Sequence, residues 1–373
     1  MEAQDIRLLH AGDVFLDTPF PSSSAAESAT RRGWVWQTLE TLLEEAERRQ
    51  VHALLLSGNL LDNTYASADT AARLCRLFSE HKDIAIFISA GKRDALGEGN
   101  LLSLFTLPEN VRVYKEQSCV FLPLAGTDLF VGGWSFAEGV EQFSPLAGKI
   151  EAPEGRAVLC GTATVGACET GASLDLGALA LEGVAYVALS GAPFEGFAET
   201  SGTVCAYSGS LEATGFADGG RGGANLITLT EDGQVLCERL PLGRGLYATE
   251  QVDVSAMTEP AEAIEAVRSV IGEKGYGRGT ALCVVYVGHT APSFTPPSLT
   301  DPEPFGLDEI LSVDHSLPDK DEAEYARDMS VRGEVVRALS PSLHANAEKT
   351  AENAADALRI TFSALDNGDS SHI

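Results

Sequence analysis

The chain has 373 residues, 44% of them apolar, which is enough to bury one large core and a second, smaller one. Its 54 acidic and 26 basic residues give a net charge of −28, so the averaged electrostatic field repels nucleic-acid backbones. This balance disfavours direct nucleic-acid binding and is typical of an acidic cytoplasmic protein.

Two further features limit the class of protein. The N-terminus MEAQDIRLLHAGD lacks a basic stretch followed by an apolar one, and no apolar run reaches the roughly 18 residues that a membrane span needs. We therefore expect neither a signal peptide nor a membrane-spanning helix. The seven cysteines are scattered without a Cys-x-x-Cys pair, which predicts reduced thiols rather than disulfides or a zinc site.

Short apolar runs that end in polar turns recur through the first 240 residues, and each predicts a strand buried on both faces. The runs are IRLLHAGD (6–13), HALLLSGN (52–59), IAIFISAGK (84–92), LFVGGW (129–134), AVLCGT (157–162), YVALSG (186–191) and VCAYSG (204–209). Helical spacing of apolar residues over 31–50 and 68–83 separates the first three runs. This alternation predicts a largely parallel α/β sheet, with its chemistry at the carboxyl ends of the strands. The turns expected there hold Asp13, Asn59, Arg93, Cys160 and Gly191.

The pattern changes after residue 240. ATEQVDVS (248–255), EPAEAIEAVRSVIGEK (259–274) and TALCVVYVGH (280–289) predict a small β-α-β domain over 241–295. The segment APSFTPPSLTDPEPF (291–305) is Pro-rich and is expected to be an extended, mobile linker. Two helices are predicted beyond it, at 330–341 and 346–366, so the third part of the chain spans 296–373.

In order and spacing, LLHAGDVFLD, ALLLSGNLLDN, ISAGKRD, VLCGTATVG, YVALSGAPFEG and YSGSLEATGF resemble the calcineurin-like metallophosphoesterases. Within that superfamily the chain is similar to the bacterial DNA-repair exonuclease branch, the nuclease subunit of SbcCD-type complexes. The resemblance covers nearly the whole chain. It implies a four-layer αββα sandwich over 1–240, with the β-α-β unit as a capping domain and a helical C-terminal extension.

The resemblance also implies a dimetal centre, but most ligand positions hold other residues. Asp13 keeps the expected type, whereas Phe15 stands where a His is expected and Asn59 where the bridging Asp is expected. Further along the chain, the family's ligand and catalytic types are replaced by Lys92, Arg93, Cys160, Gly191 and Pro193, while Asp62 and Asp94 match positions that support the ligands.

These replacements oppose metal binding on electrostatic grounds. Two divalent ions need several carboxylate and imidazole ligands, and a neutral Asn bridge supplies no charge. A guanidinium about 4 Å from a divalent ion costs on the order of 8 kcal/mol at an effective dielectric near 20. We therefore expect no metal, and we predict that Arg93 forms an ion pair with Asp13 instead.

Several of these residues also have structural explanations. Asp13, Asp62 and Asp94 suit turn or helix caps, and Cys160 suits a buried, inert thiol. His10 suits a hydrogen-bonded core histidine. His289 resembles part of a Gly-His-x-His turn but lies in the capping unit, where a strand end is expected. The Gly-rich stretch 215–223 precedes a strand rather than a helix, so it is expected to be a hairpin-type loop and not a nucleotide-binding loop.

The functional hypothesis is a catalytically degenerate phosphoesterase that acts as a non-catalytic subunit or scaffold. The resemblance implies an SMC-like coiled-coil ATPase as the partner of the segment 300–373, where Val331, Val335, Val336 and Leu339 form an apolar stripe. Packing on the chain's own core explains the stripe equally well, and a homodimer stays open.

Two other functions remain open. One is an active phosphodiesterase or DNA exonuclease that uses Mn²⁺ or Mg²⁺ in a rearranged site. The other is a sensor that binds an anion or nucleotide through Lys92 and Arg93 and needs no cofactor.

Overall fold

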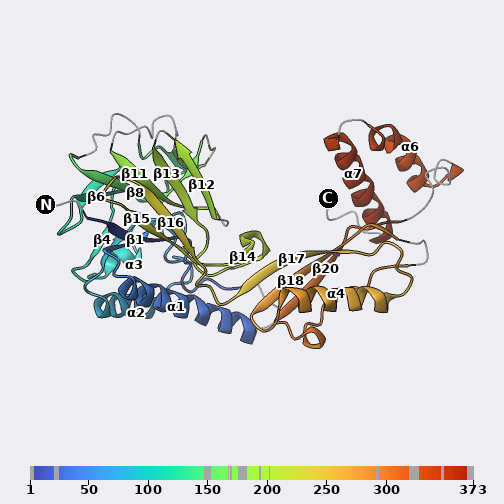
Figure 1. Cartoon of the computed structure of the whole chain (residues 1–373), viewed down its shortest axis with the longest axis horizontal. Coiled ribbons are helices and arrows are strands. Elements are labelled where there is room, and N and C mark those ends of the chain that lie inside the picture. Colours follow the sequence, from blue (N-terminus) through green and yellow to red (C-terminus); the bar gives the residue numbers. More distant parts are fainter. Residues whose placement is uncertain are drawn as a thin grey trace. The chain divides into compact units, whose positions relative to one another are not determined.

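The computed structural model describes residues 4–20, 25–146, 153–166, 168, 170–174, 183–192, 195–200, 202–290, 294–318, 327–345 and 348–367. The chain divides into two compact units, Met1–Tyr247 and Ala248–Ile373 (Figure 1). Each unit is described by itself.

The first unit begins with a six-stranded mixed sheet in the order β16-β15-β1-β2-β3-β4. The four strands from β1 to β4 are parallel, and β15 and β16 extend the sheet antiparallel. This confirms the predicted β-α-β-α-β start. The bounds are β1 (Ile6–Ala11), β2 (Ala53–Leu56), β3 (Ala85–Ile88), β4 (Val111–Val113), β15 (Ala224–Leu229) and β16 (Val235–Leu240).

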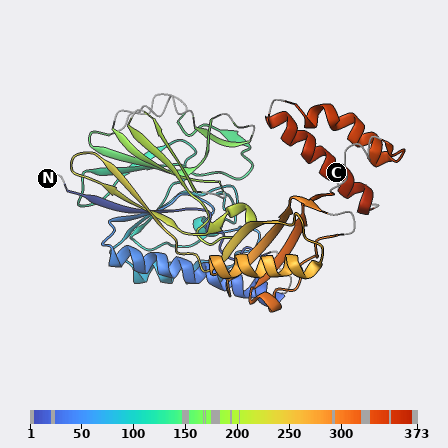
Figure 2. The same ribbon diagram turned by 45° about the vertical axis from the view of Figure 1, so that its right-hand side comes forward.

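Two amphipathic helices, α1 (Ala25–Arg48) and α2 (Ala68–Glu80), cover one face of this sheet (Figure 2). Leu39 and Leu42 of α1 and Phe78 of α2 are completely buried there. Ser67 caps α2, because its hydroxyl accepts a bond from Thr70 N, and Ser67 N in turn donates to Thr70 Oγ1. The short helix α3 (Leu101–Leu104) precedes β4.

A second six-stranded mixed sheet, in the order β12-β13-β11-β8-β6-β5, packs on the other face of the first. Leu8, Leu55 and Phe87 of the first sheet share an apolar core with Val158 and Ala188 of the second. The predicted α/β sandwich is therefore confirmed. The bounds are β5 (Val120–Pro123), β6 (Leu129–Gly133), β8 (Arg156–Thr162), β11 (Val184–Ser190), β12 (Glu195–Thr200) and β13 (Thr203–Ser208).

The outer face of the second sheet has its own core around Trp134, Leu159 and Leu189. Where the prediction placed an outer helical layer, the described residues contain a small three-stranded sheet whose strands contribute Phe143, Val165 and Leu174 to this core. The strands are β7 (Gln142–Phe143), β9 (Thr164–Val165) and β10 (Gly171–Leu174).

His10 is a buried polar residue between the two large sheets. Its Nδ1 is hydrogen-bonded to Tyr186 Oη at 2.8 Å, and its Nε2 lies 3.1 Å from both Ser57 Oγ and Leu189 O. Burial lowers the pKa of His10 to about 3, so the ring is neutral. His10 is thus the hydrogen-bonded core histidine that the sequence predicted.

The second unit contains the predicted β-α-β elements, namely β17 (Leu246–Asp253), α4 (Pro260–Lys274) and β18 (Thr280–Val287). His289 lies in the short bridge strand β19 (His289–Thr290), a strand end as expected; β19 pairs with β21 (Leu317–Pro318). The seven cysteines are free thiols, as the sequence predicted.

The predicted boundary at 295 is wrong, because the capping core continues past it. A further strand, β20 (Glu309–Asp314), pairs in parallel with β18. Phe294, Leu299 and Leu307, which belong to the Pro-rich stretch or follow it, are buried in the same core as Val267 of α4. Its Pro-rich composition predicts a linker, but its apolar residues Phe294 and Leu299 are buried against the capping core.

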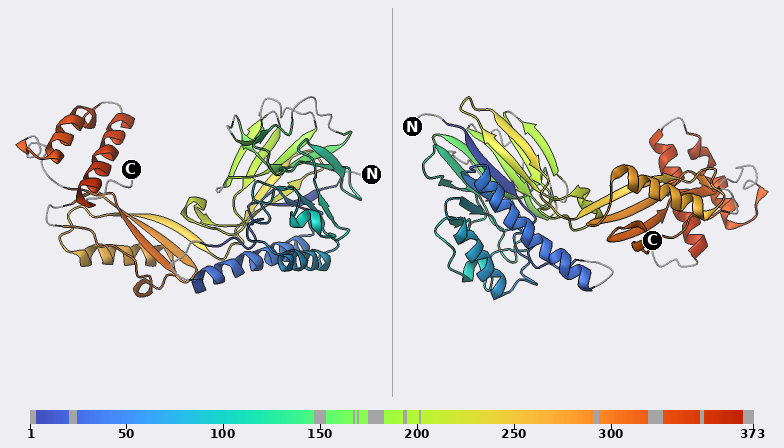
Figure 3. Two further views of the ribbon diagram at one scale, coloured as in Figure 1. Left: turned by 180° about the vertical axis from the view of Figure 1, so that it is seen from behind. Right: turned by 60° about the horizontal axis from the view of Figure 1, so that its bottom comes forward.

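Two helices follow, α6 (Val331–Leu343) and α7 (Glu348–Asn367), which confirms the predicted pair (Figure 3). Val336 is 4% exposed and packs against Leu358 of α7, so it is not an accessible partner contact. Val335 and Leu339 are half-buried, and Val331 is 63% exposed. Among the helices of the described part, none combines the length and apolarity that crossing a bilayer requires.

The turn after β2 depends on Gly58, whose φ is +142° and where a Cβ would lie 1.8 Å from Thr162 Oγ1. We expect Gly58→Ala to lower the free energy of unfolding by about 2–4 kcal/mol, through overpacking and backbone strain. Gly126→Ala is the matched control, because Gly126 has φ +79° with open space around it, and about 1 kcal/mol is expected there. Urea unfolding measures both, and equal losses would contradict the steric argument.

Candidate functional site

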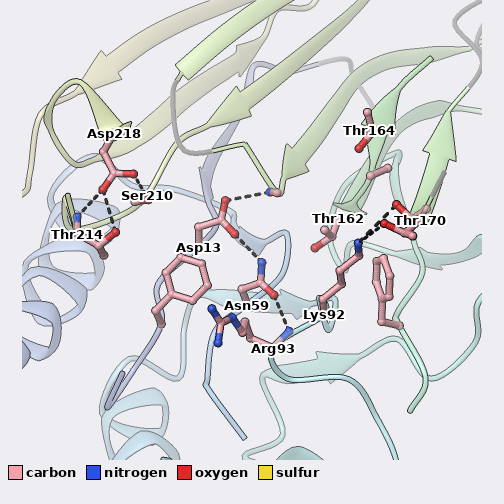
Figure 4. Close-up of a pocket in the computed structure, with 16 residues that line it drawn as sticks. Asp13, Asn59, Lys92, Arg93, Thr162, Thr164, Thr170, Ser210, Thr214 and Asp218 are labelled. Carbon is pink, nitrogen blue, oxygen red and sulfur yellow. Dashed lines mark hydrogen bonds between the residues drawn. The ribbon is translucent and has the colours of Figure 1, made fainter. Parts of the chain in front are cut away.

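A cavity of about 310 Å³ lies at the carboxyl ends of the central strands (Figure 4). The turns after β1, β2, β3 and β11 bring Asp13, Asn59, Arg93 and Gly191 to it. Its wall also includes Phe15, Lys92, Phe136, Thr162, Thr164, Thr170, Ser210, Thr214 and Asp218. Of the residues proposed from the sequence, Pro193 lies outside the described part of the chain.

Three residues of the site have left-handed backbones, namely Asp13 (φ 49°), Phe15 (φ 54°) and Asn59 (φ 54°). Main-chain bonds hold this conformation, because Asp13 N donates to Gly58 O at 3.0 Å and Phe15 N donates to Asn59 O at 2.9 Å. Non-glycine residues rarely adopt such angles, and they do so mainly where surrounding structure fixes them at functional sites. The two turns therefore form one rigid unit.

A hydrogen-bond chain runs through the centre of the pocket. Asn59 Nδ2 donates to Asp13 Oδ1 at 2.6 Å, and Gly191 N donates to Asp13 Oδ2 at 2.9 Å. Arg93 N donates to Asn59 Oδ1 at 3.0 Å. These partners fix the orientation of the Asn59 amide, since its oxygen faces an N–H and its nitrogen faces a carboxylate. We call this set the Asp13–Asn59 chain.

The predicted ion pair between Arg93 and Asp13 is wrong. Arg93 Nη1 instead lies 3.3 Å from Asp62 Oδ2, and the Asp62 side chain is 1% exposed. Both oxygens of Asp13 already accept bonds from Asn59 and Gly191, and the guanidinium pairs instead with Asp62, another buried carboxylate of this loop cluster. Asp62 also accepts a bond from Thr64 N at 2.9 Å, which is the turn-capping role expected of it.

Asp94 holds the second and third turns together from beneath the pocket. Its carboxylate accepts main-chain bonds from Gly91 N at 2.6 Å, Leu60 N at 2.7 Å and Asn59 N at 3.1 Å, with a longer one from Leu61 N. Burial raises the pKa of Asp94 to about 6, and these hydrogen bonds oppose the rise. Asp94 is therefore a capping residue, as the sequence suggested.

Cys160 does not reach the pocket. It lies two residues before the end of β8 and is completely buried in the core between the sheets, where burial raises the pKa of its thiol to about 12. The inert-thiol interpretation is correct, and the ligand position assigned to Cys160 is not. The residue that β8 presents to the pocket is Thr162, on the same strand face and one pleat nearer the strand end. Its Oγ1 lies 2.7 Å from Ser190 Oγ.

Sequence reasoning missed the turn after β13, which contributes Ser210, Thr214 and Asp218. Asp218 accepts bonds from Thr214 Oγ1 at 3.0 Å, Gly215 N at 3.1 Å and Ser210 Oγ at 3.2 Å. The motif YSGSLEATGF contains the available signal, because two of its hydroxyl residues, Ser210 and Thr214, follow the strand and Asp218 comes shortly after them.

The pocket is also lined by two cationic side chains, Lys92 and Arg93. Lys92 Nζ lies 3.4 Å from both O and Oγ1 of Thr170, and Figure 4 shows it directed toward that residue. Arg93 is 61% exposed. Its ion pair with Asp62 is therefore partly screened by solvent and contributes little to stability.

The residues of the pocket do not fit a dimetal centre. Its two carboxylates, Asp13 and Asp218, each have both oxygens engaged in hydrogen bonds. Across the residues that the structure describes, no three His, Cys, Asp or Glu side chains are grouped so as to hold a metal ion. A pair of divalent ions needs several such ligands to offset the repulsion between the ions.

The environment of Asp13 disfavours its charge. Burial raises the pKa of Asp13 to about 6, and the charge of Asp218 acts in the same direction. The bonds from Asn59 and Gly191 oppose this rise.

The sequence matches no protein-family model and no curated protein. Among solved structures it is similar to a conserved uncharacterized protein from Streptococcus pneumoniae TIGR4 described as a predicted phosphoesterase. The identity is 12% and the TM-score 0.25, over 63% of this chain and 97% of that one. It is also similar to a double mutant of Vps29 from Entamoeba histolytica, with 14% identity and a TM-score of 0.25 over 63% and 98%. These values are too low to support an inference about function.

The Asp13–Asn59 chain makes a sharp prediction for charge substitution. In Asn59→Asp a second carboxylate replaces the amide 2.6 Å from Asp13. We expect the free energy of unfolding to fall by about 2–3 kcal/mol at pH 8, because a buried donor is lost and two like charges meet. The double variant Asp13→Asn, Asn59→Asp re-creates one amide facing one carboxylate and should recover most of the loss. Additive losses in the urea double-mutant cycle would contradict the chain.

Asp13 also predicts a pH dependence. Its folded pKa of about 6 lies above the usual value of 3.8, so its stabilising contribution is fully present only below pH 3.8 and is lost as the pH rises through 6. Wild type should therefore gain about 2.4 kcal/mol relative to Asp13→Asn between pH 8 and pH 4. Urea unfolding of both proteins across this range measures the difference. A change of the opposite sign would show that Asp13 is stabilised as the carboxylate.

Proposed function

We propose that this chain is a phosphoesterase-type protein that has lost dimetal catalysis and acts as a non-catalytic subunit or scaffold. The Asp13–Asn59 chain is the observation that carries the proposal. It fills with hydrogen bonds the position where the family resemblance implies a bridging carboxylate between two ions. An amide coordinates a cation through its oxygen, and Asn59 Oδ1 already accepts a bond from Arg93 N at 3.0 Å.

The remaining groups of the pocket support this function. Catalysis by the family's chemistry needs ions that activate water and stabilise the leaving oxygen. Asp13 has no oxygen free of a hydrogen bond from the protein, and the Arg93 cation stands where the resemblance implies a transition-state histidine. The sensor function through Lys92 and Arg93 is less favoured, because Asp62 offsets the charge of Arg93.

The direct test is metal content and activity of the full chain. After purification and incubation with Mn²⁺ or Mg²⁺, we expect metal well below one equivalent and no hydrolysis of a generic phosphodiester or of linear DNA above the buffer rate. Asp13→Ala is the control that separates this chain from a contaminating enzyme. Hydrolysis that follows the protein through purification and disappears in Asp13→Ala would establish an active enzyme with a rearranged site.

The proposed contact with a partner lies on the C-terminal helices. Of the proposed stripe, Val331 is the residue that stays well exposed, and Met329 beside it is 93% exposed. An SMC-like coiled-coil ATPase remains the proposed partner, with a homodimer as the alternative. A deletion from residue 300 is unsuitable as a test, because it removes β20 and the buried Leu307.

We therefore expect Val331→Glu to weaken co-purification with an SMC-like ATPase at least tenfold, since a charge enters an apolar contact. Val313→Glu, on β20 and 38% exposed, is the matched control and should retain the partner. Light scattering of the isolated protein tests the homodimer. Equal retention of wild type and Val331→Glu would remove the helices from the interface.

A further inference from the structure

A second cavity, of about 220 Å³, adjoins the first pocket and shares Ser210 and Asp218 with it. Its wall carries two arginines, Arg221 of β14 (Gly220–Arg221) and Arg239 of β16. Two guanidinium groups face one small cavity in a chain whose net charge is −28. Neither arginine belongs to the metal-site positions discussed above, so the cavity is a separate feature of the first unit.

Arg221 is oriented by main-chain oxygens. Its Nη1 donates to Gly243 O at 3.1 Å and to Arg244 O at 2.8 Å. Carbonyl groups fix the direction of a guanidinium but do not offset its charge. Among the described residues, no carboxylate lies within ion-pair distance of Arg221, and its Nε and Nη2 have no protein acceptor. These nitrogens are pre-oriented donors for an external acceptor.

Arg239 of β16 supplies the second guanidinium. Its Nη1 donates to Ser208 O at 2.5 Å and lies 3.3 Å from Asn225 Oδ1. These contacts, and a further interaction of the side chain, hold the guanidinium beside the turn that follows β13. Arg239 is half-buried, so its position is set by packing before any ligand binds.

Asp218, the acidic residue in the cavity wall, is hydrogen-bonded to its own turn. Asp218 Oδ1 accepts Ser210 Oγ, and Asp218 Oδ2 accepts Thr214 Oγ1 and Gly215 N. These bonds hold the carboxylate toward its own turn, and its single negative charge is outnumbered by the two guanidinium groups of the wall. Next to it, Gly219 has φ +63°, and a Cβ there would meet no atom within 4 Å, so bare main chain borders the cavity. A ligand can approach the backbone closely at such a glycine.

We propose that this cavity is a binding site for a phosphate group, held by Arg221 and Arg239. The planar guanidinium is the side chain best matched to a tetrahedral oxyanion, because its parallel N–H groups bind two oxygens at once. The size of the cavity suits one phosphate group rather than a whole nucleotide. The Gly-rich turn is followed by a strand and not by a helix, so no helix N-terminus donates to the phosphate as in nucleotide-binding loops. The two arginines supply the donors instead.

The test is isothermal titration of the full chain, without metal or partner, at constant ionic strength. Inorganic phosphate and adenosine monophosphate are titrated separately, because free phosphate and a phosphomonoester offer the same group from two sources. Two charge-assisted contacts predict a Kd on the order of 1 mM. Arg221→Gln should raise this Kd about tenfold or more, and Arg221→Lys by a smaller factor, because the charge stays while the paired donors are lost.

Two matched variants locate the site. Arg112→Gln alters another exposed arginine that donates to a main-chain oxygen, Val111 O at 3.0 Å, but lines neither cavity. Lys92→Gln alters the first pocket. Both should leave the Kd within about twofold of wild type, a change of less than 1 kcal/mol. Tighter binding of adenosine monophosphate than of phosphate identifies the phosphomonoester as the ligand.

Three results would overturn the proposal: no heat with either ligand up to ten times the expected Kd, a Kd unchanged in folded Arg221→Gln, or a loss confined to Lys92→Gln, which places the anion in the first pocket. Circular dichroism establishes that each variant is folded. Should Arg221→Gln not fold, Arg221→Lys supplies the decisive comparison. The proposed loss of catalysis is tested by metal and hydrolysis, so either proposal can fail without the other.

Discussion

The site depends on one short hydrogen bond, from the Asn59 amide to the Asp13 carboxylate at 2.6 Å. An aspartate at residue 59 would add a negative charge that only a cation could offset, whereas the amide supplies a donor and needs none. The neighbouring groups follow from this exchange. Gly191 N occupies the other oxygen of Asp13, Arg93 N satisfies the amide oxygen, and the Arg93 side chain turns to Asp62. The Asp13 carboxylate at the centre of the pocket is thereby held by hydrogen bonds from neutral donors.

Short, rigid contacts beneath the pocket hold the loops that metal ions would otherwise cross-link. Asp94 gathers main-chain N–H groups from the second and third turns, and a Cβ at Gly91 would lie 2.3 Å from Asn59 Oδ1. Gly58 allows the second turn to pass against Thr162. Hydrogen bonds and close packing therefore hold the geometry of these turns.

Apolar patterning predicted most of the fold, because buried strands and amphipathic helices have clear periods; β1, β2, β3 and α2 match within a few residues. The boundary at 295 failed because proline content was weighed above the burial of Phe294 and Leu299. The site was harder. The Arg93–Asp13 pair failed because nothing in a sequence says which of two nearby carboxylates already has its donors. Cys160 was misplaced by one pleat, since motif spacing does not mark where a strand ends.

The left-handed backbone at Asp13 and Asn59 limits which residue types can stand at these positions. Asn, Asp and Gly tolerate such angles best, so few substitutions are free of backbone strain. Asn and Asp codons differ by a single nucleotide, so Asp is the most accessible replacement for Asn59. That replacement would bring a second carboxylate against Asp13 in a buried site. The backbone angle and the neighbouring charge together leave residue 59 few tolerated alternatives.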